Sequence, residues 1–134
     1  MAFEHNILHP SRHVPWLYDF VKYGVDWGSA AFRMTFAAAQ GGSAVITLSN
    51  AAAGLQGVSA TYDAGASHPS TGAIVGATRI KVQIDEATLE GAGIGFPAAP
   101  TALALSYDLL VTPTASPQQV HAFGTLTIKH GVGD

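Results

Sequence analysis

Short stretches in which apolar and polar residues alternate recur along the chain and limit the folds available to it. The clearest lies at 78–84, where apolar residues expected to face the core alternate with polar ones expected to face outward. The apolar residues are Ile80, Val82 and Ile84, and the polar ones are Arg79, Lys81 and Gln83. Successive side chains of a strand point to opposite faces, so this pattern is typical of a half-buried β-strand. No stretch keeps a helical period over the ~10 residues that a stable helix needs. The sequence therefore predicts an all-β protein.

Turn-forming residues divide these stretches into seven or eight short strands. The main strands are expected at 16–23, 31–36, 44–49, 55–62, 78–84, 107–112 and 120–129. Glycine-rich and proline-rich segments separate them, and a single helical turn is expected at 85–90. Such a series predicts one antiparallel β-sandwich domain, Ig-like in the loose sense, over residues 16–134. Residues 1–15 show no sustained period and are expected to form an extended N-terminal arm.

The composition excludes several classes of function. The chain has nine acidic and six basic residues, a net charge of -3 and no cysteine. This charge argues against nucleic-acid binding, and the absence of cysteine excludes disulfides and thiolate metal sites. Only 11% of residues are charged, against roughly 25% in typical domains. A surface this sparse in charge suits a protein whose faces are covered by neighbours, the alternative being a plain low-charge monomer.

Targeting and membrane segments are not expected. The N-terminus has neither a basic start nor an apolar run, which argues against a signal peptide. No stretch approaches the ~20 apolar residues that a membrane helix requires.

The order of the strand motifs resembles a family of virus proteins. The motifs are Phe32-Arg33-Met34-Thr35-Phe36, then 44–48, 80–88, Tyr107-Asp108-Leu109-Leu110-Val111-Thr112 and 123–128. Over residues 30–130 they resemble small structural proteins of tailed bacteriophages and prophages, in particular the N-terminal domain of phage baseplate upper proteins. The chain differs in its histidine-containing start and in ending without a receptor-binding domain, which favours an adaptor or decoration role.

This resemblance implies a non-enzymatic virion protein that is made in the host cytoplasm. It would be a homo-oligomer, a trimer or a ring, docked onto other virion proteins in the tail, baseplate or fibre-attachment region, without a cofactor. A capsid decoration protein is an alternative within the same class. A carbohydrate-binding module for host recognition, using the loop aromatics Trp27, Tyr62 and Phe96, is an alternative from another class.

Three histidines in the N-terminal arm are the first candidate site. On a helix, the spacing of four between His5, His9 and His13 would place them on one face, as in a metal site. Prolines 10 and 15 favour extended backbone instead, so we expect exposed or interface histidines and no metal. If the arm contacts a neighbour, aromatic side chains supply most of the interface energy. The predicted partner interface is His5, His9, His13, Trp16 and Trp27.

Catalytic and nucleotide sites are not indicated. The glycines of 91–95 are followed by prolines and not by a helix, so a phosphate loop is not expected. The acidic residues are scattered, and no Ser/His/Asp signature is present. His68 is expected in an exposed loop, and His121 on the outer face of its strand.

Overall fold

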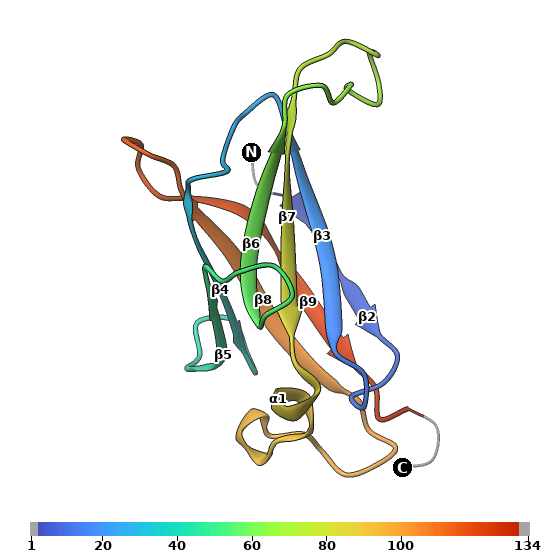
Figure 1. Cartoon of the computed structure of the whole chain (residues 1–134). Helices are drawn as coiled ribbons and strands as arrows, with labels where there is room; N and C mark the ends of the chain where they lie inside the picture. The colour runs from blue at the N-terminus through green and yellow to red at the C-terminus, as the bar shows by residue number, and fades with distance from the viewer. Residues whose placement is uncertain (1–2, 132–134) are drawn as a thin grey trace.

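Two β-sheets that face each other make up the computed structural model, which describes residues 3–131 (Figure 1). The strands are β1 (Phe3–Glu4), β2 (Ile7–His9), β3 (Trp16–Tyr23), β4 (Ala31–Ala37), β5 (Ala44–Ser49), β6 (Gly57–Asp63), β7 (Ala77–Ile84), β8 (Leu103–Thr112) and β9 (Gln119–Ile128). The larger sheet has the order β1–β9–β8–β4–β5, with β2 also paired to β9, and the smaller has the order β3–β7–β6. The prediction of a mostly β chain is confirmed.

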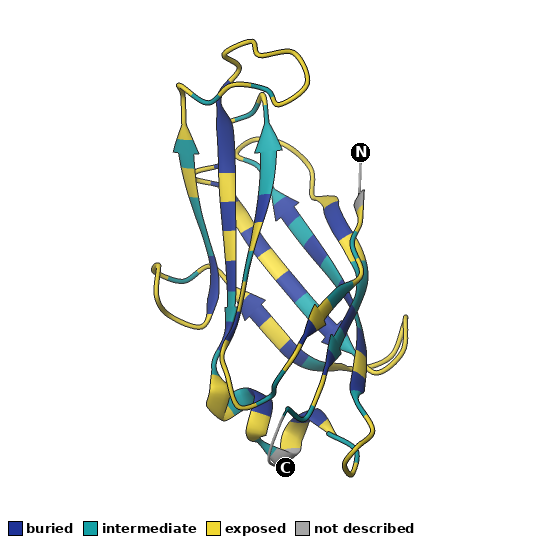
Figure 2. Cartoon of the chain, turned by 90° about the vertical axis from the view of Figure 1, so that its right-hand side faces the viewer, coloured by how far each residue is buried: buried dark blue, intermediate teal, exposed yellow. Residues whose placement is uncertain are grey.

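Most strand positions follow the alternation in the sequence, as the bands of buried and exposed residues along the strands show (Figure 2). The largest difference is at β8, which begins at Leu103, four residues before the predicted start. Leu103 and Leu105 point into the core, but the alanines beside them hide the alternation because alanine is itself apolar. β6 begins two residues later than predicted, at Gly57.

The core lies between the two sheets and is rich in aromatic side chains. Trp16 of β3 and Phe36 of β4 meet edge to face across the interior, with ring centroids 5.9 Å apart. Phe20, four residues further along β3, faces Tyr107 of β8, with ring centroids 6.5 Å apart. An aromatic pair of this kind adds about 0.5–1.5 kcal/mol to the stabilisation that comes from burial alone. The inward faces of the two sheets therefore hold each other in place.

A short helical segment closes one end of the core. The helix α1 (Glu86–Glu90) confirms the expected turn after β7, and the 3-10 turn η1 (Ala92–Ile94) follows it. Leu89 and Ile94 are buried and point into the cluster between the sheets. The described residues contain no helix with the length and apolar character that crossing a bilayer takes.

The N-terminal segment is extended, as expected, but it belongs to the larger sheet. β1 and β2 pair in parallel with β9, whereas the other strand pairs are antiparallel. The backbone N–H of His5 donates to the carbonyl of Phe123 at 2.8 Å, and that of Lys129 donates to the carbonyl of His9 at 3.0 Å. Backbone pairing needs no side-chain period, which explains why the sequence pattern misses it. Residues 1–2 of the predicted arm lie outside the described residues.

Gly124 lets the N-terminal segment approach β9 closely. Its φ is +149°, and a Cβ added there would lie 2.0 Å from the carbonyl oxygen of His5. The same oxygen accepts a hydrogen bond from the hydroxyl of Tyr107 at 2.7 Å. A side chain at position 124 is therefore incompatible with the observed position of the segment.

We expect Gly124→Val to lower the free energy of unfolding by about 2–4 kcal/mol and to make residues 3–9 sensitive to protease. Urea denaturation and limited proteolysis measure the two effects. Gly41→Ala is the control, because Gly41 also has a positive φ, +81°, but faces open space and should cost only about 1 kcal/mol. An unchanged unfolding midpoint in Gly124→Val, with the N-terminal segment still resistant, would contradict the close approach.

Candidate interaction surface

The outer face of the larger sheet is hollowed into a groove of about 850 Å³. β4, β8 and β9 provide its floor, and the turn between β4 and β5 contributes to its lining. Its side chains include Arg33, Asp108, Phe123 and, from the N-terminal segment, Glu4. Three regions that are far apart in the sequence, the N-terminal segment, β4 with its turn and the β8–β9 pair, thus contribute to one surface.

The strand register places several of these side chains in a single row across the sheet. Thr35 is opposite Asp108, Asp108 is opposite Phe123, and Phe123 is opposite Glu4. The hydroxyl of Thr35 donates a hydrogen bond of 2.6 Å to a carboxylate oxygen of Asp108. This bond fixes the orientation of the carboxylate, because it is charge-assisted and half-buried.

Charged groups of both signs face the groove without an ion pair. Within residues 3–131, the ion pair present joins His13 to Glu90, and neither residue lines the groove. Arg33 and Glu4 are exposed and Asp108 is half-buried. These three charges are therefore available to a ligand or partner that brings complementary groups.

Apolar side chains lie beside these charges. Phe123 and Val120, both on β9, retain 39% and 41% of their exposure and line the groove. Aromatic side chains and arginine are the types that contribute most energy to protein–protein interfaces. The combination of a partly exposed ring, an arginine and oriented carboxylates suits recognition of another molecule.

Tyr107 connects the groove to the N-terminal segment. Burial raises the pKa of its phenol well above the usual value, and the neighbouring Tyr18 adds to this effect. The hydroxyl thus stays protonated and keeps its hydrogen bond to the carbonyl of His5. Because Glu4 adjoins this contact, the docked N-terminal segment also positions one charge of the groove.

The two predicted interface tryptophans lie in the core of the chain. Trp16 is 3% exposed and Trp27 is 7% exposed. Trp27 is held by its backbone N–H, which donates to the hydroxyl of Thr78 at 2.9 Å. A folded copy therefore does not present either ring to a partner. Trp27 is instead a core residue.

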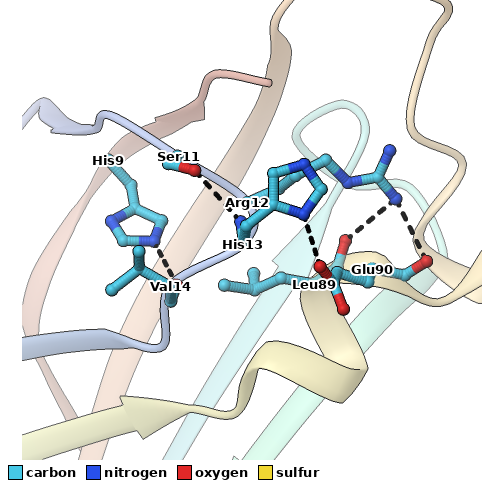
Figure 3. A network of polar contacts seen from close by, with 7 residues as sticks. All are labelled: His9, Ser11, Arg12, His13, Val14, Leu89 and Glu90. Carbon is cyan, nitrogen blue, oxygen red and sulfur yellow. Dashed lines mark hydrogen bonds and ion pairs between the residues drawn. The ribbon is translucent and has the colours of Figure 1, made fainter. Parts of the chain in front are cut away.

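The three histidines of the N-terminal segment are separated from each other by different contacts. His5 meets the ring of Phe20 edge to face at 5.6 Å. His9 is buried, contrary to expectation, with its Nε2 2.7 Å from the carbonyl oxygen of Val14 (Figure 3). His13 is exposed and pairs with Glu90. Among the described residues, no group of three or more His, Cys, Asp or Glu side chains is arranged to hold a metal ion.

Arg12, between His9 and His13, ties the N-terminal segment to α1. Its guanidinium donates to the carbonyls of Leu89 and Glu90 at 3.3 and 3.1 Å (Figure 3). The last carbonyls of a helix have no partner within the helix, so a cation there is favourable. The guanidinium also lies 4.2 Å from the ring centroid of Phe96. This contact occupies one of the aromatic rings that the sequence offered for sugar binding.

The predicted trio of sugar-binding aromatics is not brought together. Trp27 is buried, and Tyr62 packs against Gly76, where an added Cβ would lie 2.3 Å from the phenol oxygen. Phe96 contacts Arg12 and the ring of His130. The segments of Tyr62 and Phe96 lie at opposite ends of the sandwich, since one ends β6 and the other follows η1 (Figure 1).

His121 is buried, so its predicted position on the outer face is wrong. The register between β8 and β9 shifts at this point: Leu109 is opposite Ala122, while Leu110 is opposite Val120. The extra residue of this β-bulge is His121, which lets two successive side chains both turn inward. Its ring meets that of Trp27 edge to face at 5.5 Å. His68, predicted to be exposed, is half-buried against Tyr23.

The environment of His121 disfavours its charged form. Burial, and to a smaller extent the positive charge of Lys22 and the neighbouring His5, together lower its pKa from 6.5 to about 4. In the unfolded chain the ring binds a proton near its ordinary pKa, whereas in the folded chain it stays neutral down to about pH 4. The folded state therefore loses stability as the pH falls from about 7 to 4.

We expect the free energy of unfolding to fall by about 2 kcal/mol more in the natural protein than in His121→Phe between pH 7 and pH 4. Urea denaturation at a series of pH values measures this difference, and comparing the variants removes the contribution of the other histidines. Parallel pH profiles for the two proteins would show that His121 titrates normally and is not held neutral by its surroundings.

The groove, rather than the predicted tryptophans, is the candidate site. The alternation of apolar and polar residues in 31–36 and 107–112 puts Arg33, Thr35 and Asp108 on outward strand faces, but it cannot tell which strands are neighbours. Phe123 carries no signal, since an aromatic residue in a strand usually points inward. In comparisons with known proteins, no family model, no curated protein and no solved structure matches the chain.

Proposed function

We propose that the chain is a non-enzymatic structural protein of a tailed bacteriophage virion. It acts as an assembly or adaptor module in the tail, baseplate or fibre-attachment region, and it is assembled with other virion proteins in the host cytoplasm. The virion part of this proposal rests on the order of the strand motifs, from Phe32 to Phe36 through 123–128, which resembles phage baseplate proteins. The assembly part rests on the groove.

The observation that carries the assembly role is the set of unpaired charges beside apolar groups on one sheet face. Arg33, Glu4 and Asp108 line the groove together with Phe123 and Val120. Only 11% of the residues in the chain are charged, so the lining of the groove, with three charged residues, is richer in charge than the chain as a whole. Opposite charges side by side also set the orientation of a partner, because mismatched placements bring like charges together.

We further infer an Ig-like arrangement of the sandwich. The smaller sheet, β3–β7–β6, corresponds in order to strands B, E and D of an Ig domain. The larger sheet, β9–β8–β4–β5, corresponds to strands G, F, C and C′. In this assignment the groove lies on the outer face of the G–F–C–C′ sheet. That face is open over the three strands that form the groove floor.

Recognition of a carbohydrate is a second candidate for the same groove. Its lining includes the hydroxyls of Thr35, Ser106 and Thr125, the Gln40 amide and the Asp108 carboxylate, with the ring of Phe123 beside them. Sugars are bound by such polar groups together with an aromatic face. In this candidate, Phe123 takes the place of the aromatic residues predicted from the sequence to bind sugar.

A capsid decoration role differs from the first proposal only in the place of the protein in the particle.

The virion role is tested by mass spectrometry of head and tail fractions from purified particles. We expect the protein in the tail fraction, and we expect Arg33→Glu to reduce its incorporation about tenfold by reversing one charge of the groove. Arg79→Glu is the matched control, because Arg79 is also exposed but lies on the smaller sheet. The protein in head fractions alone would favour decoration, and its absence from particles would overturn the proposal. Equal loss in both variants would exclude the groove as the contact.

A glycan array tests the second candidate. If the groove binds sugar, the natural protein should show specific binding that Phe123→Ala lowers by up to about tenfold, because one aromatic contact contributes about 0.5–1.5 kcal/mol. Leu17→Ala, which removes an exposed apolar side chain from the smaller sheet, should leave binding unchanged. No binding by the natural protein, or equal loss in both variants, would exclude carbohydrate recognition at this groove.

A further inference from the structure

The larger sheet places the ring of Phe123 between two carboxylates on the floor of the groove. In the strand register, Phe123 of β9 is opposite Glu4 of β1 on one side and Asp108 of β8 on the other. Neighbouring strands are about 4.8 Å apart, so the row of these three residues is about 10 Å long. All three line the groove of about 850 Å³, a volume within the range of ligand sites. A ligand that reaches the ring therefore also reaches both carboxylates.

The fold holds this row in position. The β-bulge at His121 turns two successive side chains inward, so that Phe123 comes back to the outer face, where it retains 39% of its exposure. The hydroxyl of Thr35 donates to Oδ1 of Asp108 at 2.6 Å, and the pairing of β1 with β9 places Glu4. Side chains that are already in position lose less conformational freedom when a ligand binds.

A ring between two carboxylates fits a cation. The face of an aromatic ring attracts ammonium and guanidinium groups, and carboxylates accept strong hydrogen bonds from the same groups. An anion or a purely apolar group would instead displace water from Glu4 and Asp108 without replacing its hydrogen bonds, which is unfavourable. The row therefore selects a basic side chain.

The basic residues of the chain itself do not fill this position. All six lysines and arginines fall within the described residues, and of these only Arg33 lines the groove. It lies on β4, on the far side of Asp108 from Phe123. Within residues 3–131, no ion pair joins Arg33 to either carboxylate of the row. The cation has to come from another molecule.

Arg33 adds a second point of recognition. It lies two strands away from Phe123 and two residues along β4 from Thr35, which is opposite Asp108. With strands about 4.8 Å apart and a rise of about 3.4 Å per residue, the Cα atoms of Arg33 and Phe123 are roughly 12 Å apart. Residues four positions apart in an extended segment are about 13 Å apart and point to the same side. Such a segment spans the distance from the row to Arg33.

We infer that the groove binds an extended segment of a partner protein that carries a basic residue and, four positions away, an acidic one. The lysine or arginine lies over Phe123 between Glu4 and Asp108, and the acidic residue pairs with Arg33. Charge complementarity at both points fixes the position of the segment in the groove. This inference rests on the proposed role of the groove in assembly and names the chemistry of the partner that the groove accepts.

Peptide titration, followed by the amide NMR spectrum of the isotope-labelled natural chain, tests the cation. The probe is a five-residue peptide with blocked termini, a lysine at one end, a glutamate at the other, and glycine and serine between; both orders of the ends are titrated. The control peptide has norleucine in place of lysine, which keeps the apolar stem and removes the charge. We expect saturable shifts around Phe123 and Asp108, and at least about fivefold weaker binding of the norleucine peptide at low salt.

Variants of the chain locate the cation. Glu4→Gln and Asp108→Asn keep the shape of the side chain and remove its charge, so each should weaken binding of the lysine peptide about threefold and leave the norleucine peptide unaffected. Phe123→Leu, which removes the aromatic face, should weaken it about twofold. Asp19→Asn is the matched control, because Asp19 is an exposed carboxylate on the smaller sheet, and it should bind as the natural chain does.

The amide spectra of the free variants show that each is folded. Three results would each overturn the inference: no binding of the lysine peptide by the natural chain, equal binding of the two peptides, or as large a loss in Asp19→Asn as in Asp108→Asn.

The inference and the proposed function can fail separately. Incorporation of Arg33→Glu into particles tests the groove as the assembly contact, whatever the chemistry of the partner. Loss of incorporation in that variant, together with no binding of the lysine peptide, would support the groove as the contact and overturn the basic segment. Peptide binding that depends on Glu4 and Asp108, together with normal incorporation of Arg33→Glu, would support the cation site and overturn its role in assembly.

Discussion

The pairing of residues 3–9 with β9 determines which surfaces of this protein are open to other molecules. Gly124 leaves room for the carbonyl of His5, and the hydroxyl of Tyr107 donates to that carbonyl. With this segment in place, the β9 edge of the larger sheet is covered and Glu4 adjoins the groove. β5 forms the opposite side of the sheet, where β6 bridges to the residue that follows it, Asn50. A segment that looked like a free arm therefore closes one side of the sheet and leaves its outer face open to contact.

The packing of the core also limits which side chains can reach a partner. Trp16 and Phe36 join the sheets, and the bulge at His121 lets a histidine fill the space beside Trp27. Neither tryptophan is available to a partner, so the energy of binding a partner has to come from other, smaller side chains on the surface. Arg33, Asp108 and Phe123 provide such features on the groove. The groove lies on the larger sheet, which is consistent with a protein that is held by neighbours on one side.

Strand positions were predictable from the sequence because alternation reports burial directly, as Ile80, Val82 and Ile84 show. Three other features of the fold could not be predicted from the sequence. Strand neighbours follow from long-range pairing, so the row from Thr35 to Phe123 has no local signal. Parallel pairing of β1 and β2 depends on backbone groups, which carry no side-chain pattern. The bulge at His121 shifts the period by one residue and reverses the expected face.

Hydrogen exchange of the natural protein, followed by mass spectrometry of its N-terminal peptides, tests the docked segment most directly. Backbone amides that are hydrogen-bonded in a stable sheet open only with a large fraction of the protein, so they exchange slowly. The account predicts that the amide of His5, and those of β2 that pair with β9, exchange about as slowly as the amides of β9 itself. Exchange of residues 3–9 within seconds, beside a protected β9, would show a free arm and would contradict the assignment of the open surfaces.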